Sequence, residues 1–197
     1  MTTHNPLVTI EHDDYFTTDL IYASTHNFLE RAIYRDLGIT ECQVHHDLYA
    51  VLLKTKNLLK KHQLKLCIFD GYRPMAAQQA MWKVLPDERY IANPLKGSKH
   101  QRGTAVDCYL MHMDDTPLIF PTTPDAYDPE IEKDPVQRMA YLEKASHSYA
   151  CSLDEQQACA NRALLRSIME QSGFIALEEE WWHYEIPNAD TYPVLLF

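Results

Sequence analysis

The sequence has little that would bind it to nucleic acid or place it in a membrane. Its 28 aspartate and glutamate residues outnumber 18 lysine and arginine residues, which gives a formal net charge of -10. Nucleic acid and anionic lipid both attract basic patches, so this charge argues against both partners. No apolar run approaches the roughly 20 residues of a membrane span. We therefore expect a soluble protein that acts on a small molecule.

The sequence also lacks cysteine pairs with metal-binding or redox spacing. Its five cysteines are an odd number, and no two form a Cys-x-x-Cys pair, so neither a disulfide framework nor a thiolate metal site is expected. Residues 1–14 contain no basic segment followed by an apolar one, which an export signal would need. We therefore expect buried thiols in a cytoplasmic protein, with Cys108 a nucleophile only if a base lies beside it. The cysteines are Cys42, Cys67, Cys108, Cys151 and Cys159.

Hydrophobic spacing predicts a mixture of helices and strands. A chain of 197 residues with 46% apolar content can bury one core, so we expect a single domain over 1–197. Apolar residues at helical spacing, and a capping-box pattern that starts at Ser152, mark the helices. The predicted helices span 44–63, 74–85 and 152–173, and the predicted strands span 64–69, 104–111, 174–177 and 181–186.

Residues 114–135 are expected to form a long irregular loop. Five prolines fall in this stretch, and each fixes a backbone angle and removes a hydrogen-bond donor. Long loops inside compact domains are usually functional. This one is a candidate wall of an active site.

A histidine and an aspartate flank a glycine in residues 98–107. Gly103 allows the backbone to turn after His100, and the predicted strand then presents Asp107 on the same side as the small Ala105. This arrangement leaves room for an ion beside the carboxylate. A surface histidine with satisfied hydrogen bonds is the alternative interpretation of His100.

A second histidine lies in the aromatic segment 180–184. His183 could be one buried imidazole in a core strand, or it could complete a metal site with His100 and Asp107. Two imidazoles and one carboxylate are the ligand set of a catalytic zinc ion that keeps a fourth position for water. The combination predicts metal-assisted hydrolysis.

Glu180 is the carboxylate left over for acid and base chemistry. Glu178 and Glu179 are interpreted as a solvated acidic face, while Glu180 lies nearest to His183 and to the aromatic residues that would raise its pKa. In a straight strand Glu180 and His183 would point to opposite faces. A bulge or turn at Trp181 is therefore needed to bring both to one ion.

Arg73 lies at a predicted junction between a strand and a helix. Its planar guanidinium could hold a substrate carboxylate or stabilise the oxyanion of a tetrahedral intermediate. It could equally be a surface arginine that stacks on Tyr72 or Trp82. The residues alone do not choose between these roles.

Four segments together resemble the D-alanyl-D-alanine dipeptidase family. Gly-Tyr-Arg-Pro and Glu-Trp-Trp-His are specific to this family, whereas the His-to-Asp segment is shared with zinc D,D-carboxypeptidases. The chain departs from the family between Asp114 and Ser146. The matching segments are 19–28, 71–74, 98–107 and 180–185.

The resemblance implies a fold, a cofactor and a set of site residues. The fold would be α+β, with a central antiparallel sheet flanked by helices and a small closed cavity for substrate. One zinc ion would be held by His100, Asp107 and His183, with Glu180 as catalytic base and acid and Arg73 stabilising the transition state. The substrate-binding residues by the same analogy are Ser98, Tyr22 and Asp128, of which Asp128 matches the family aspartate that meets the substrate amino group.

The implied reaction is hydrolysis of the cell-wall precursor D-Ala-D-Ala, in glycopeptide resistance or in recycling. A carboxypeptidase that trims longer muropeptides is an alternative, favoured by an open groove in place of a deep site. A zinc-stabilised binding module without activity is another. The presence of both Glu180 and Arg73 weighs against it, because a structural ion needs neither and is closed by a fourth protein ligand.

Overall fold

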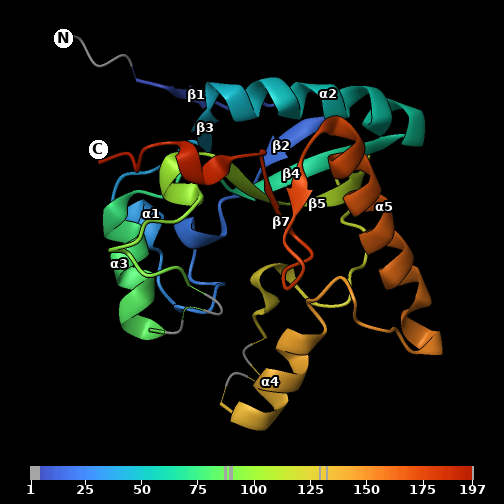
Figure 1. The fold of residues 1–197 in the computed structure, drawn as a ribbon. Helices are drawn as coiled ribbons and strands as arrows, with labels where there is room; N and C mark the ends of the chain where they lie inside the picture. The colour runs from blue at the N-terminus through green and yellow to red at the C-terminus, as the bar shows by residue number, and fades with distance from the viewer. Residues whose placement is uncertain (1–4, 87, 89–90, 129, 132, 197) are drawn as a thin grey trace.

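The computed structural model describes residues 5–86, 88, 91–128, 130–131 and 133–196, which form an α+β fold (Figure 1). Its main sheet has the strand order β2-β4-β5-β7-β6. The last four strands in this order pair antiparallel as expected, while β2 adds to β4 in parallel. The strands are β2 (Phe16–Thr18), β4 (Leu64–Asp70), β5 (Ala105–His112), β6 (Ile175–Ala176) and β7 (His183–Glu185), and β1 (Leu7–Thr9) pairs separately with β3 (Gln43–His45).

Helices lie on both sides of this sheet. In Figure 1, α2 runs along the top of the sheet and α5 descends on the right, α1 and α3 lie together on the left, and α4 is at the bottom. α2 packs against β4 and α5, and α5 packs against β5. None of the described helices is long and apolar enough to cross a bilayer. The helices are α1 (Ile33–Asp36), α2 (His46–His62), α3 (Met75–Val84), α4 (Pro135–Glu143) and α5 (Gln156–Ser172).

The helices predicted from hydrophobic spacing form close to the expected positions. α2 buries Leu48, Leu52 and Leu59, which share the face that packs on the sheet. The capping box of Ser152 and Glu155 is present, although the first turn, Leu153–Glu155, is a 3-10 helix and α5 starts after it. α5 ends at Gly173 in the left-handed conformation that favours glycine.

The region expected to be a loop ends in a helix that the sequence analysis missed. Pro135 occupies the first position of α4, where its lack of an N–H costs nothing. Asp134 caps the helix by accepting hydrogen bonds from the backbone N–H groups of Val136 and Gln137. The proline that suggested an irregular chain is therefore a helix-initiating residue.

The expectation that all five cysteines are free is wrong for one pair. Cys151 and Cys159 form a disulfide, because the 3-10 turn before α5 folds the chain back and brings their Cα atoms to 6.2 Å. This separation is within the range a disulfide can span. Cys42, Cys67 and Cys108 are free and buried as predicted. Burial raises the pKa of Cys108 well above its usual range, so it remains a thiol.

Candidate active site

The register of three neighbouring strands brings remote residues together. Asp70 at the end of β4 pairs with Asp107 in β5, and Asp107 pairs with His183 at the start of β7. His100 enters from the 3-10 turn just before β5. Gly103 closes that turn with a φ of 68°, and a Cβ at this position would lie 2.8 Å from the backbone nitrogen of His45. The glycine that the sequence analysis associated with a turn is therefore required there.

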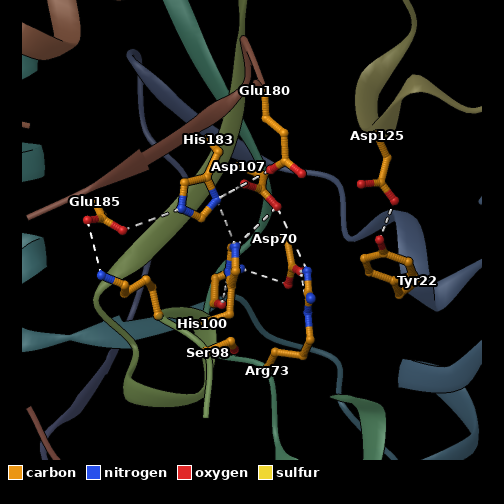
Figure 2. A network of polar contacts seen from close by, with 12 residues as sticks. Tyr22, Asp70, Arg73, Ser98, His100, Asp107, Asp125, Glu180, His183 and Glu185 are labelled. Atoms are coloured by element: carbon orange, nitrogen blue, oxygen red, sulfur yellow. Dashed lines mark hydrogen bonds and ion pairs between the residues drawn. The ribbon is translucent and has the colours of Figure 1, made fainter. Parts of the chain in front are cut away.

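The three predicted metal ligands meet in one buried cluster (Figure 2). His183 Nδ1 lies 3.0 Å from Asp107 Oδ1 and 3.2 Å from His100 Nε2. His100 Nε2 lies 3.3 Å from the other carboxylate oxygen of Asp107. One ligand atom from each residue lies within 4.8 Å of the others, so the group could hold a metal ion.

Each imidazole is held with one nitrogen facing this centre. His100 donates its Nδ1–H to the carbonyl oxygen of Gly71 at 2.8 Å, which leaves Nε2 as a potential ligand. His183 Nε2 faces Glu185 Oε2 at 3.8 Å, and Glu185 is itself 3.3 Å from Lys99 Nζ. Partners of this kind fix the tautomer and orientation of metal-binding histidines. The donor set therefore fits a metal ion.

Burial and mutual charge control the protonation of the cluster. Burial alone would raise the pKa of Asp107, but the imidazoles of His100 and His183 hold it below its usual range. Burial alone would lower the pKa of His183, whereas its hydrogen bond to Asp107 and the nearby carboxylate of Glu185 raise it to about 10. A metal ion must displace that proton, so metal binding will weaken as the pH falls.

A turn brings Glu180 to the same centre. The backbone N–H of His183 donates to the carbonyl of Glu180 at 3.1 Å, and the turn between them reverses the chain at Trp181. Glu180 Oε2 consequently lies 3.9 Å from His183 Nδ1. This is the turn that the sequence analysis required, and it shortens the predicted last strand to three residues. Burial raises the pKa of Glu180 to about 8.

The aromatic residue inside the turn anchors it to the loop after β5. Trp181 is fully buried and stacks on Phe120 with ring centroids 4.1 Å apart. Its indole N–H donates to Thr122 Oγ1 at 2.8 Å. Segment 114–123 therefore helps to position Glu180.

Arg73 is buried in the segment between β4 and α3, and its guanidinium lies beside the cluster (Figure 2). Its Nε and Nη2 both donate to Asp70 Oδ2, at 3.0 and 2.6 Å, and Nη2 lies 3.9 Å from Asp107 Oδ2. Tyr34 donates to the other oxygen of Asp70 at 2.6 Å. Arg73 is thus not a surface residue, and its partner Asp70 is a site residue that was not identified from the sequence.

Ser98 belongs to the same network through Gln78. Its hydroxyl donates to Gln78 Oε1 at 3.4 Å, and Arg73 Nη1 donates to the same oxygen at 3.3 Å. The hydroxyl oxygen also accepts from the backbone N–H of Gln101 at 3.0 Å. Ser98 is buried beside the guanidinium, on the side of the cluster away from Glu180 (Figure 2).

Asp125 faces the site from the loop in place of Asp128. Tyr22, one of the predicted substrate contacts, donates its hydroxyl to Asp125, and Figure 2 shows the pair beside Arg73 and Glu180. Asp125 adopts a left-handed φ of 61°, which aspartate tolerates better than most residues. Burial raises its pKa to about 6. Asp128 instead accepts a hydrogen bond from the backbone N–H of Glu130, and it is not among the described residues that line the cavity below.

Asp125 and Glu180 open into a cavity of about 840 Å³. Trp182 lines it near the metal-ligand cluster, and Met139 from α4 lines it further away. The expected wall from segment 114–135 is present at Asp125 and Ala126. The cavity is larger than the small closed site that the resemblance implied.

Comparison with known proteins agrees with these observations. Residues 3–120 and 137–195 match a family model described as D-ala-D-ala dipeptidase. The chain is 33% identical over 177 residues to a D-alanyl-D-alanine dipeptidase of Escherichia coli strain K12. The aligned region covers 90% of this chain and 82% of that protein. It is 32% identical over 167 residues to the protein of the same name from Enterococcus faecium, covering 75% of this chain and 74% of that one. The unmatched segment 121–136 contains Asp125.

Proposed function

Because the chain belongs to the D-Ala-D-Ala dipeptidase family, we propose that it is a zinc-dependent dipeptidase that hydrolyses D-Ala-D-Ala to two D-alanines. The observation that carries this proposal is the buried cluster of His100, Asp107 and His183 with the carboxylate of Glu180 beside it. Three protein ligands of nitrogen and oxygen type, with a position left open, are typical of catalytic zinc. When bound, zinc would polarise the scissile carbonyl and lower the pKa of a water molecule.

Glu180 carries the proton in this mechanism. Its carboxylate takes a proton from the attacking water, the water oxygen bonds to the carbonyl carbon, and the same proton passes to the leaving amine as the peptide C–N bond breaks. Glu180 Oε2 lies 3.9 Å from His183 Nδ1, so the carboxylate is next to the proposed metal site and need not be a metal ligand. Burial suits the role, because it raises the pKa to about 8 and so makes the carboxylate a stronger base.

Arg73 stabilises the negative charge that develops on the carbonyl oxygen. Asp70 fixes two of its guanidinium nitrogens, so the group is held in place before the reaction starts. Preorganised donors of this kind stabilise a transition state because they need no rearrangement. Burial tends to lower the pKa of Arg73, but Asp70 and the other neighbours hold it well above its usual range, so the charge is permanent.

The two ends of the dipeptide are bound by opposite sides of the site. Asp125 and Tyr22 hold the free amino group, so Asp125 takes the role that the resemblance suggested for Asp128. Ser98 contributes to the site of the free carboxylate. A substrate that lacks either charge would leave a buried polar group unpaired, which is a strong basis for discrimination.

The proposed setting is the cytoplasm, where the dipeptide is a cell-wall precursor. Removing D-Ala-D-Ala there would serve glycopeptide resistance or precursor recycling. The buried thiols Cys42, Cys67 and Cys108 are compatible with a reducing compartment. In that compartment Cys151 and Cys159 would be in the dithiol form.

The test is release of free alanine from three peptides by the zinc-loaded protein. We expect hydrolysis of D-Ala-D-Ala, and no hydrolysis of L-Ala-L-Ala or of a pentapeptide ending in D-Ala-D-Ala. Glu180→Ala should lower turnover by about 10²- to 10⁴-fold with one zinc still bound per chain. Glu178→Ala, which removes an exposed acid two residues away, should change turnover less than about twofold. Wild-type turnover in Glu180→Ala, or loss of zinc from it, would contradict the assigned role.

A further inference from the structure

The cavity beside the reacting centre is larger than an alanine dipeptide requires. Its volume is about 840 Å³, near the upper end of the roughly 300 to 1,000 Å³ of pockets that enclose drug-sized ligands. D-Ala-D-Ala has only one methyl group at each side-chain position. Much of the space must therefore be available to another part of a substrate.

The position of the cavity shows which part of the substrate it would take. Asp125 and Glu180 both line it, while Arg73 and Ser98 are absent from its described lining. Under the proposed function, Asp125 binds the amino group and Glu180 acts at the scissile bond. The residue between these two points is the amino-terminal one, so its side chain projects into the cavity.

The walls of the cavity are mainly apolar. Phe28, Leu85 and Ile91 line one side, and Met139 and Leu142 from α4 line the other. A side chain with several carbon atoms would be removed from water by contact with these residues.

The charged groups of the lining are mostly acidic. Glu143 and Glu179 are exposed beside the apolar residues, and Glu88 also lines the cavity but is paired with Lys96 at 2.7 Å. Arg138 is the cation among the described lining residues. An acidic side chain would be repelled, whereas an apolar or cationic one would be accepted.

Part of this wall falls where the chain departs from its family. The family match stops at residue 120 and resumes at 137, so Asp125, Ala126 and the first residues of α4 lie in the unmatched segment. Part of the cavity wall therefore lies outside the segments that match the family model.

We propose that this cavity binds the side chain of the amino-terminal residue, and that the chain prefers dipeptides X-D-Ala in which X is large and apolar or cationic. The inference rests on the proposed function and extends its substrate class. The reaction is unchanged: water is added, the peptide bond breaks, and D-alanine leaves with its amine protonated.

The experiment compares kcat/KM of the zinc-loaded protein for D-Ala-D-Ala, D-Leu-D-Ala, D-Lys-D-Ala and D-Glu-D-Ala. One methylene in a hydrophobic pocket changes kcat/KM by about 10-fold or more, so D-Leu-D-Ala should exceed D-Ala-D-Ala by at least about tenfold. D-Lys-D-Ala should also exceed it, and D-Glu-D-Ala should be the poorest substrate.

Two variants on the same helix test where the preference arises. Met139→Trp fills the cavity, so the ratio of kcat/KM for D-Leu-D-Ala to that for D-Ala-D-Ala should fall about tenfold or more. Val136→Trp adds the same indole at a residue that is 78% exposed and outside the described lining, and the ratio should not change. Circular dichroism of both variants checks that α4 remains folded.

The outcomes separate this inference from the proposed function. If no dipeptide is cleaved, the proposed function fails. If D-Ala-D-Ala is cleaved but D-Leu-D-Ala is slower, only the enlarged specificity is overturned. Cleavage of a pentapeptide ending in D-Ala-D-Ala would overturn it as well, because the cavity would then hold a chain extension and not a side chain.

Discussion

The buried pair of Asp70 and Arg73 should control both the stability of the fold and the position of the guanidinium. Asp70 is completely buried, and its carboxylate accepts hydrogen bonds from Arg73, from Tyr34 and from the backbone N–H of Gly71. Asp70→Asn keeps the size of the side chain and removes its charge. Among the described residues, Arg73 then keeps Asp107, at 3.9 Å, as its ion-pair partner.

The expected loss of stability follows from these contacts. Removing one partner of a buried ion pair costs about 3 to 5 kcal/mol, because the other charge is left uncompensated. Asp107 offsets part of this loss, so we expect about 3 kcal/mol for Asp70→Asn. Tyr34→Phe removes one hydrogen bond to the same carboxylate and keeps the buried ring, so it should cost about 1.5 kcal/mol.

The assay is urea unfolding followed by tryptophan fluorescence, with a chelator present so that metal binding does not contribute to the free energy. A second readout is the zinc-loaded kinetics, in which Asp70→Asn should lower kcat more than it changes KM because Arg73 loses its preorganised position. A free energy of unfolding for Asp70→Asn no lower than that of Tyr34→Phe would refute the reasoning.

Two other residues give predictions at opposite sides of the site. The pKa of Asp125 is raised to about 6, so its carboxylate becomes neutral as the pH falls through this value, and kcat/KM should decrease about tenfold per pH unit below it. Asp125→Asn should lose the step near this value and keep the separate acidic step of Glu180, whose pKa is raised to about 8, and an unchanged pH profile would contradict the assignment. Glu185→Gln weakens the partner that orients His183, so zinc affinity measured by competition with a chelator should fall about 10- to 100-fold. Equal affinity would show that the orientation of His183 is set elsewhere.

The sequence was sufficient to predict the regular elements that carry the metal-ligand cluster. Hydrophobic periodicity located α2, β4, α3 and β5 to within a few residues. The turn at Gly103 could be predicted because glycine permits a reversal of the backbone. The turn at Trp181 could be predicted because Glu180 and His183 would point to opposite faces of a straight strand. Local rules succeed here because the position of each metal-ligand side chain is set by the strand or turn that contains it.

The partners that lie between elements could not be predicted in this way. Asp70 was not identified from the sequence, because its contact with Arg73 depends on how β4 meets β5 and on Tyr34 from α1. The disulfide of Cys151 and Cys159 depends on a 3-10 turn that the cysteine spacing does not reveal. These contacts are set by tertiary packing, which periodicity does not report.

The proposed contact with the substrate amino group was the hardest part to predict because Asp125 lies in the proline-rich segment. There the chain has no repeating pattern that fixes which side chains point inward, so Asp128 and Asp125 could not be distinguished by position. The left-handed backbone of Asp125 and its hydrogen bond from Tyr22 favour Asp125 in the proposed role. Under the proposed function, reaction chemistry depends on strands whose register the sequence specifies strongly, whereas the proposed preference for the amino-terminal residue depends on a loop and on α4. That division allows the cavity to change its substrate while the cluster of His100, Asp107 and His183 is kept.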